Sequence, residues 1–190
     1  MNAIAPIKLI FADMDNDGDL DMIEGNYGEI NHLFLNNGTA SPFIGDRGIN
    51  ITTAAKNTIS ISIGDVNKDS FPDMVSGNYN QMNLLYLNSG PPDFFTTSIT
   101  IGNVSDKTRY VTLSDINGDT YPDLLVGNDG INYIYYNNPQ QASNPFAGVQ
   151  PVYLSSEYNC TNFLMAVDMN KDGYIDILAG NSYGKKQTLS

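Results

Sequence analysis

The amino-acid sequence predicts an all-β protein built from one repeated unit of four strands. Two observations predict it. Short apolar segments alternate with polar residues at period two, and a shared pattern recurs along the chain at intervals of 52, 50 and 53 residues. Glycine (17) and proline (9) occur throughout, and no window combines a helical period with a capping residue. The 190 residues, 41% of them hydrophobic, are enough to bury a core.

Each repeat is defined by a loop of nine residues, here called the aspartate loop. The four loops span residues 13–21, 65–73, 115–123 and 168–176. They share Asp at positions 1, 5 and 9 and Asp or Asn at position 3. A Gly-Asn pair begins 12 residues after the first aspartate of every loop: Gly25-Asn26, Gly77-Asn78, Gly127-Asn128 and Gly180-Asn181. The constant register indicates four copies of one structural unit.

The strands are expected on both sides of each aspartate loop. The first strand of each unit is expected at 7–12, 58–63, 109–114 and 162–167, and the second follows the loop at 22–24, 74–76, 124–126 and 177–179. A segment that ends in Asn supplies the third strand, at 32–36, 84–88 and 133–137. The fourth copy is expected to end before it reaches a third strand. A less regular stretch, such as 94–99 or 152–155, supplies the fourth strand. The Gly-Asn pair is expected to form a turn after the second strand.

A repeated four-stranded antiparallel unit of this length predicts the blades of a β-propeller. The blades are expected at about 7–57, 58–108 and 109–161, with a half blade at 162–190, so the chain forms one propeller segment. Propellers close with about four to eight blades. We therefore expect the ring to be completed by the rest of a longer chain or by other subunits.

The aspartate loops concentrate negative charge, since they hold 14 of the 21 acidic residues. Carboxylates two residues apart repel one another unless a cation lies between them. Oxygens from positions 1, 3, 5 and 9, with the backbone carbonyl of position 7, suit Ca²⁺, and about four calcium sites are expected. The candidate ligands are Asp13, Asp15, Asp17, the Asp19 carbonyl and Asp21; Asp65, Asn67, Asp69, the Phe71 carbonyl and Asp73; Asp115, Asn117, Asp119, the Tyr121 carbonyl and Asp123; and Asp168, Asn170, Asp172, the Tyr174 carbonyl and Asp176.

The loops allow two other interpretations. The first loop also matches the EF-hand pattern, with Glu24 at its twelfth position, but the flanks are strands and the other copies carry Ser76, Val126 and Ala179 there. The loops could also be Asx turns without a metal. Position 6 often takes a left-handed backbone, so the loops with Ser70 and Thr120 instead of glycine are expected to bind calcium more weakly.

Composition excludes several functions. With 9 basic and 21 acidic residues the formal net charge is −12, which disfavours nucleic-acid binding. No apolar run is long enough to insert in a membrane, and no secretory signal is visible. Cys160 and His32 are the single residues of their kinds, so a disulfide within the chain is excluded and a catalytic triad is implausible. No catalytic residues are assigned.

Three features recur together: an aspartate loop between two strands, a Gly-Asn pair, and a strand of the type Leu84-Leu-Tyr-Leu-Asn88. This combination resembles the FG-GAP/VCBS repeats of integrin α-like propellers. The resemblance covers about residues 7–184, and Gly-Asn in place of Gly-Ala-Pro points to the VCBS-like branch. It implies a calcium-stabilised adhesion or ligand-binding module, lectin-like or protein-binding, of an extracellular or cell-surface protein. The alternatives are a propeller of a polysaccharide lyase or hydrolase, and a structural assembly subunit.

Overall fold

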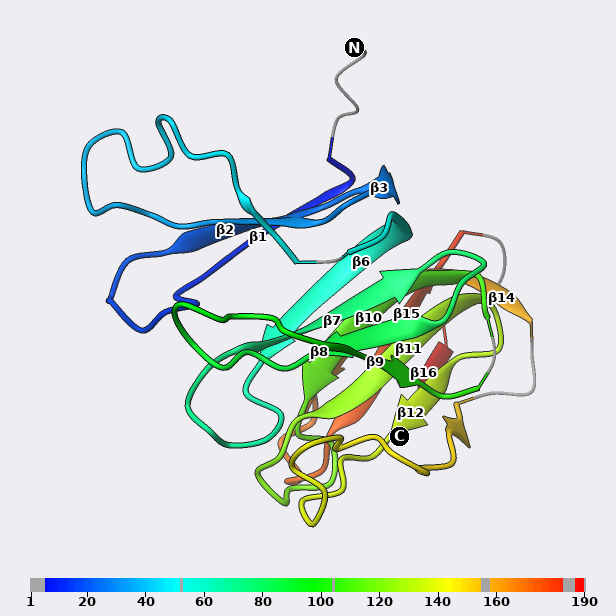
Figure 1. Ribbon diagram of the computed structural model, residues 1–190. Helices are drawn as coiled ribbons and strands as arrows, with labels where there is room; N and C mark the ends of the chain where they lie inside the picture. Colours follow the sequence, from blue (N-terminus) through cyan, green and yellow to red (C-terminus); the bar gives the residue numbers. More distant parts are fainter. Residues whose placement is uncertain (1–5, 52, 104, 155–157, 183–186, 190) are drawn as a thin grey trace.

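The structure is a computed structural model that describes residues 6–51, 53–103, 105–154, 158–182 and 187–189. Within these residues the regular elements are β-strands, so the chain is all-β (Figure 1). None of the described segments forms a helix long and apolar enough to cross a membrane.

The strands form four consecutive antiparallel blades, each in chain order from its innermost strand outward. The first blade contains β1 (Lys8–Ala12), β2 (Asp21–Gly25), β4 (His32–Phe34) and β5 (Ile49–Asn50). The second contains β6 (Lys56–Gly64), β7 (Asp73–Asn78), β8 (Asn83–Tyr86) and β9 (Ser98–Ile101). The third contains β10 (Thr108–Ser114), β11 (Asp123–Gly130), β12 (Tyr133–Tyr135) and β13 (Val152–Tyr153), and the fourth β14 (Asn159–Val167), β15 (Asp176–Asn181) and β16 (Gln187–Leu189). The architecture is a partial β-propeller.

The fourth blade contains a third strand, which the sequence analysis did not expect. Gln187 follows Gly180 by the same interval at which His32 follows Gly25, and β16 pairs with β15 in the register that β4 uses with β2. The expectation was wrong because Gln187-Thr188-Leu189 lacks the apolar pattern of the other third strands.

The fourth strands also differ from expectation. In the second blade β9 begins at Ser98, whereas Phe94, expected in the strand, lies in the preceding loop, where its side chain is buried. The backbone carbonyl of Phe94 accepts a hydrogen bond from the Ser89 amide at 2.9 Å. In the third blade β13 covers only Val152–Tyr153, and Ser155 lies outside the described residues.

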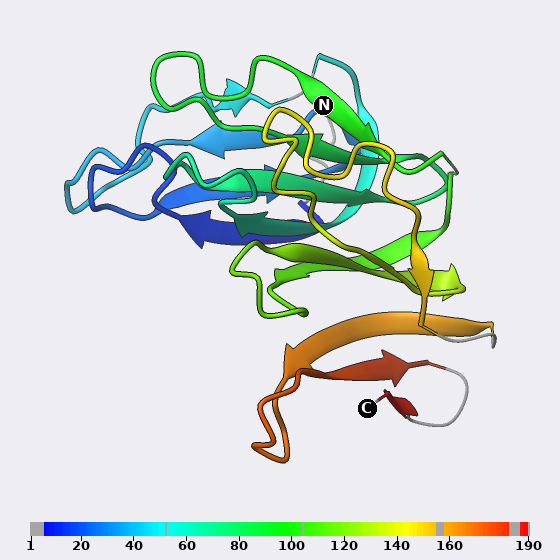
Figure 2. The same cartoon turned by 90° about the horizontal axis from the view of Figure 1, so that it is seen from below.

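Short pairings connect each blade to the next at the end of its second strand. β3 (Tyr27–Glu29) pairs with the start of β6, Tyr79 with Lys107, and the end of β11 with the start of β14. These contacts place β1, β6, β10 and β14 next to one another as the inner strands, and the blades follow one another in an open array (Figure 2).

The hydrophobic core lies between the blades rather than within one of them. One cluster, which includes Ile23, Ile61 and Met74, fills the space between the first two blades. A second, with Val75 and Val111, lies between blades two and three, and a smaller one lies between blades three and four. Alternate residues of one strand therefore face different neighbouring blades, as the period of two requires.

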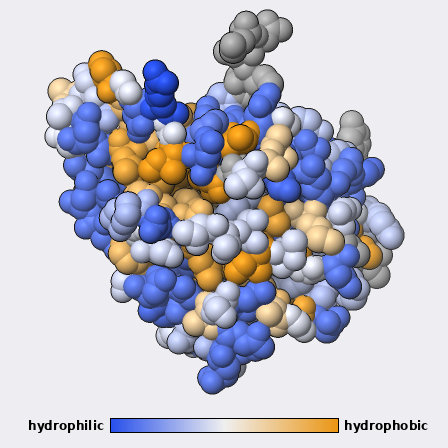
Figure 3. Space-filling model, viewed as in Figure 1, coloured by the Kyte–Doolittle hydropathy of each residue, from blue (hydrophilic) through white to orange (hydrophobic). Residues whose placement is uncertain are grey.

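The two outer faces of the array expose apolar side chains, because no blade formed by the described residues covers them. On β1 the exposed residues are Leu9 and Phe11, and on β14 they are Phe163, Met165 and Val167. Figure 3 shows apolar side chains beside the first blade on one face of the molecule, with hydrophilic side chains around them.

Candidate functional site

The four aspartate loops adopt one common backbone conformation. In each, the carboxylate at position 1 accepts hydrogen bonds from the amides of positions 5 and 6: Asp13 accepts from Asp17 at 3.1 Å and from Gly18 at 3.0 Å. The equivalent bonds of Asp65, Asp115 and Asp168 measure 2.9–3.2 Å. The loop therefore wraps around its first aspartate.

Positions 4 and 6 both require a left-handed backbone. At position 6 the φ angles are 95° for Gly18, 78° for Ser70, 76° for Thr120 and 90° for Gly173. This confirms the left-handed conformation expected at this position. Position 4 is left-handed as well, with Asn16, Lys68, Gly118 and Lys171 there, and the sequence analysis did not identify it. Asn tolerates this conformation better than most residues, whereas lysine has no such advantage.

Position 9 ties the loop to the sheet. Asp73 is fully buried, and its carboxylate accepts the Val66 amide at 2.8 Å and the Asn88 amide at 2.9 Å. The carboxylates of Asp21 and Asp123 each accept the two equivalent backbone amides. Asp176 accepts the amide that is equivalent to that of Val66. Burial raises the pKa of Asp73 to about 7, despite these two backbone hydrogen bonds. Burial is also the main cause of the raised pKa of Asp21 and Asp123.

Hydrogen bonds join positions 3, 5 and 7 of the loop to one another. In the second loop the Asn67 amide group donates to the Asp69 carboxylate at 2.9 Å, and the third and fourth loops repeat this contact. The residue at position 7 donates its amide to the position-5 carboxylate at 2.9 Å in all four loops. This bond holds the peptide unit between positions 6 and 7, which directly precedes the carbonyl expected as a ligand.

The first loop has the densest set of carboxylates. Oxygens of Asp13, Asp15 and Asp21 lie within 4.8 Å of one another. The pKa of Asp15 is raised, first by partial burial and next by the nearby Asp21 carboxylate. Hard oxygen donors this close together fit Ca²⁺, which takes six to eight oxygens and would offset their repulsion. The other loops have two carboxylates fewer, because position 3 is asparagine and position 7 is aromatic.

The profile of the family described as FG-GAP-like repeat matches the sequence three times, over residues 13–76, 65–126 and 115–179. Each match begins at position 1 of one aspartate loop and reaches past the next. The chain belongs to the FG-GAP-like repeat family. This confirms the resemblance seen in the sequence.

Solved structures with this fold include BBS1N in complex with ARL6DN, from crystals soaked with mercury. Its TM-score is 0.59 at 11% identity over 99% of this chain. The lead-soaked crystal gives 0.56, also at 11% identity, over 100% of this chain. The chain spans only about half the length of these proteins, 52% and 57%. No curated protein matches the sequence.

The second and third FG-GAP-like repeats each contribute an asparagine that holds the loop of the preceding blade. The Asn88 side chain donates to the Met14 carbonyl at 2.8 Å, and Asn137 donates to the Val66 carbonyl at the same distance. These residues are the last of the Leu-Tyr-Leu-Asn type of segment. The sequence showed them at near-constant spacing but did not indicate a role, because their acceptors lie 74 and 71 residues away.

A buried threonine connects neighbouring FG-GAP-like repeats at the other end of the inner strand. Thr58 accepts from the Asn31 side chain at 3.0 Å and donates to the Asn78 side chain at 2.9 Å. Thr161 makes the same pair of bonds with Asn132 and Asn181. Threonine precedes the first aspartate by the same interval in the last three repeats, a signal that the sequence analysis missed.

The Gly-Asn pair is not the turn that the sequence analysis expected. Gly77 lies inside β7 and Gly127 inside β11, and neither has a positive φ. A Cβ atom on Gly77 would lie 2.8 Å from a Val111 methyl carbon, and one on Gly127 would lie 3.1 Å from a methyl carbon of Thr161. Glycine is required here because the next blade packs directly against the backbone.

Other titratable residues are found outside the loops. His32 Nδ1 lies 3.3 Å from a Glu24 oxygen across paired strands, a contact that their separation in sequence did not reveal. Asp129 lies 4.0 Å from Lys107 and 3.8 Å from Arg109. Glu157 lies outside the described residues. These pairs are partly exposed and lie outside the aspartate loops, and they are not assigned a catalytic role.

Proposed function

We propose that the chain is a calcium-binding, non-catalytic propeller module that binds a protein or glycan ligand for an extracellular or cell-surface protein. The observation that carries the proposal is the fourfold repetition of one aspartate loop with the same backbone bonds. The clustered oxygens of Asp13, Asp15 and Asp21 support it. In each loop the candidate ligands listed above would hold the ion, which would neutralise the carboxylates and bind adjacent strands together.

Binding to a protein partner has support from the comparisons. The similar structures contain BBS1N in complex with ARL6DN, which shows that a protein with this fold binds another protein. The exposed apolar faces of the first and last blades supply a surface for the rest of the ring, from a longer chain or other subunits.

The calcium proposal is tested by isothermal titration calorimetry and thermal unfolding of the full chain in Ca²⁺ and in excess chelator. We expect calcium to raise the melting temperature, because a ligand that binds only the folded state stabilises it. The dissociation constants should fall at about 10⁻⁴–10⁻³ M, the range of extracellular modules. Equal melting temperatures in both conditions would overturn the proposal, and submicromolar binding would overturn the extracellular assignment.

Two matched variants test the loop itself. Asp13→Ala removes the residue around which the first loop wraps and should abolish one binding event. Asp15→Asn gives this loop the residue found at position 3 in the other three, so it should retain binding. Equal loss in both variants would show that the assigned ligand set is wrong.

The non-catalytic assignment is tested with soluble uronate polymers. The chain is incubated with pectate or alginate in calcium, and the unsaturated product is followed by absorbance. No product is expected. Product formation that loop substitutions abolish would favour the lyase alternative instead.

A further inference from the structure

A continuous chain of buried hydrogen bonds joins the first aspartate loop to the second. It begins at Asp21, whose carboxylate accepts the Met14 amide at 2.8 Å, and the Met14 carbonyl accepts the Asn88 side chain at 2.8 Å. The Asn88 amide then donates to the Asp73 carboxylate at 2.9 Å. All four residues are buried. The chain therefore connects position 9 of one loop to position 9 of the next.

The same arrangement joins the second loop to the third. The other oxygen of the Asp73 carboxylate accepts the Val66 amide at 2.8 Å, and the Val66 carbonyl accepts the Asn137 side chain at 2.8 Å. The Asn137 amide donates to the Asp123 carboxylate at 2.8 Å. Asp73 thus uses one oxygen in each half, and the three carboxylates belong to one chain. Contiguous buried networks of this kind can carry energetic coupling between sites.

The equivalent asparagine of the first repeat makes only bonds within its own repeat. The Asn36 amide donates to the Asp21 carboxylate at 2.8 Å, and the Asn36 side chain donates to the Leu20 carbonyl at 3.1 Å. Asn88 and Asn137 make the equivalents of both bonds and also reach the preceding loop. The bond between loops is therefore additional to what the repeat requires.

A shared asparagine gives two neighbouring loops a common ordering cost. Calcium bound by the second loop would fix the Asp73 carboxylate, and with it the Asn88 amide that bonds one of its oxygens. The Asn88 side chain holds the Met14 peptide unit, and the Met14 amide orients Asp21 in the first loop. A second ion would then meet ligands that are already ordered, so its entropic cost of binding would be smaller. The expected coupling is positive.

Repulsion between bound ions opposes this coupling only weakly. The first loop has five acidic residues and no basic residue, so it stays negative with one Ca²⁺. The second has three acidic residues and Lys68, so one ion makes it neutral, and the third, with three acidic residues and no basic one, stays negative. No filled loop becomes positive, and salt screens what repulsion remains.

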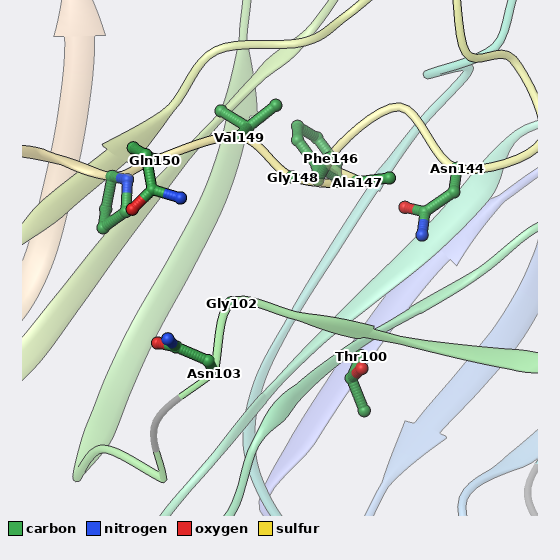
Figure 4. Close-up of a pocket in the computed structure, with 10 residues that line it drawn as sticks. Thr100, Gly102, Asn103, Asn144, Phe146, Ala147, Gly148, Val149 and Gln150 are labelled. Carbon is green, nitrogen blue, oxygen red and sulfur yellow. The ribbon is translucent and has the colours of Figure 1, made fainter.

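The hydrogen-bond chain is separate from the cavity between the second and third blades. This cavity measures about 320 Å³, and its lining includes Thr100 in β9 and Asn144 in the connection between β12 and β13 (Figure 4). None of the residues that line it belongs to an aspartate loop or to the hydrogen-bond chain. Val66 and Asn137, in contrast, are buried, so water does not compete for their bond.

We propose that Asn88 and Asn137 couple neighbouring calcium sites, so that occupation of one aspartate loop raises the calcium affinity of the loop beside it. Asn88 links the first loop to the second, and Asn137 links the second to the third. Both are positioning residues, since they act through the aspartates at position 9. The inference rests on the proposed function and adds a regulation of the same sites: three loops bind calcium as one cooperative unit.

The test is a nuclear magnetic resonance titration of the full ¹⁵N-labelled chain with Ca²⁺. The backbone amides of residues 17–19, 69–71, 119–121 and 172–174 report on the four loops separately. Asp65→Ala disables the second loop, and the affinities of the first and third loops should then fall at least about fivefold, as for coupled sites. The fourth loop is not reached by this chain among the described residues, and its affinity should change less than about twofold.

Charge alone predicts the opposite result. In the unsubstituted chain the filled second loop is neutral, whereas the Asp65→Ala loop without calcium keeps two acidic residues against Lys68 and stays negative. It would attract calcium to its neighbours and raise their affinity. A fall in the affinity of the first and third loops therefore reports ordering and not charge.

The asparagine variants show which link carries the effect. In the Asn88→Ala chain, Asp65→Ala should no longer change the affinity of the first loop but should still weaken the third, because Asn137 is intact. Asn137→Ala should give the reverse pattern, so each variant is the matched control for the other. Asn36→Ala should preserve both effects, because its side chain bonds only within its own repeat. A general loss of stability would weaken all loops and would not produce these patterns.

Three results would overturn the inference. The first is unchanged affinity of the first and third loops after Asp65→Ala, and the second is equal weakening of all three remaining loops. The third is an Asn88→Ala chain in which Asp65→Ala still weakens the first loop as it does in the unsubstituted chain. If Asn88→Ala does not fold, Asn137→Ala makes the same comparison for the third loop.

The same titration separates this inference from the proposed function. If no loop shows calcium-dependent shifts, the calcium-binding module is wrong and the coupling is wrong with it. If all four loops bind calcium and Asp65→Ala affects only the second, the module stands and the coupling alone fails.

Discussion

Ser70 and Thr120 occupy backbone positions that glycine fills in the other two aspartate loops. Their φ angles, 78° and 76°, bring Cβ close to the following carbonyl oxygen. A β-branched residue such as Thr120 is the less favourable of the two. The repeat tolerates this because the carboxylates of Asp65 and Asp115 accept the amides of these same residues.

We predict that Ser70→Gly and Thr120→Gly stabilise the chain by about 0.5–1 kcal/mol each, since relief of the left-handed strain exceeds the extra entropy of glycine in the unfolded state. Both loops should also bind calcium more tightly. Urea unfolding and calorimetry measure the two effects. Gly173→Ala, the reverse change in the fourth loop, should destabilise, and a stabilising effect would contradict the argument.

The buried Asp73 makes the metal-free chain sensitive to pH. Its pKa is about 7 in the folded state against 3.8 in the unfolded state, so the folded state binds the proton more tightly. Its contribution to stability is complete below about pH 4 and is lost as the pH rises through about 7. In chelator, urea unfolding between about pH 4.5 and pH 7.5 should therefore show falling stability. Rising stability across this window would contradict the prediction.

At the scale of elements, the contact between one second strand and the next inner strand determines how closely the blades approach. Gly25, Gly77 and Gly127 each lie against side chains of the following blade. Gly180 occupies the same place in β15, but among the described residues no further blade packs against it, and it is exposed. The equivalent glycine is thus packed against a neighbouring blade in the first three repeats and exposed in the fourth.

This difference provides an internal control. Gly77→Ala should destabilise by about 1–3 kcal/mol, because its Cβ would lie 2.8 Å from Val111 and 2.9 Å from Thr108 side-chain carbons. Gly180→Ala should be neutral or slightly stabilising, since a Cβ there would meet the Phe163 Cβ at 3.4 Å and the Phe163 carbonyl oxygen at 3.8 Å, both ordinary van der Waals contacts. Equal losses in both variants, measured by chemical unfolding, would show that strand conformation rather than blade packing is responsible.

At the scale of the whole molecule, the chain is an open array with an unusual charge. Its formal net charge is −12, and most of the acidic residues lie in the four aspartate loops, which occupy the same position in each repeat. Self-repulsion of this kind destabilises a compact state. Each bound Ca²⁺ adds two positive charges, so four ions would bring the net charge to −4.

Salt should therefore substitute in part for calcium. In chelator, raising NaCl from about 0.02 M to about 0.5 M shortens the screening length several-fold and should raise the melting temperature. In saturating calcium the same change in salt should have a smaller effect. A salt effect of equal size in both conditions would indicate that the loops do not bind the ion.

The sequence by itself determined the repeat, the all-β class, the blades and the aspartate loops, because these depend on local spacing: a period of two within strands and fixed intervals between copies. It did not determine the roles of Thr58 and Asn88 or of the packed glycines. Each of these depends on residues of a neighbouring blade that lie far away in the chain. Only the tertiary structure brings them together, because propeller blades bury their faces against one another.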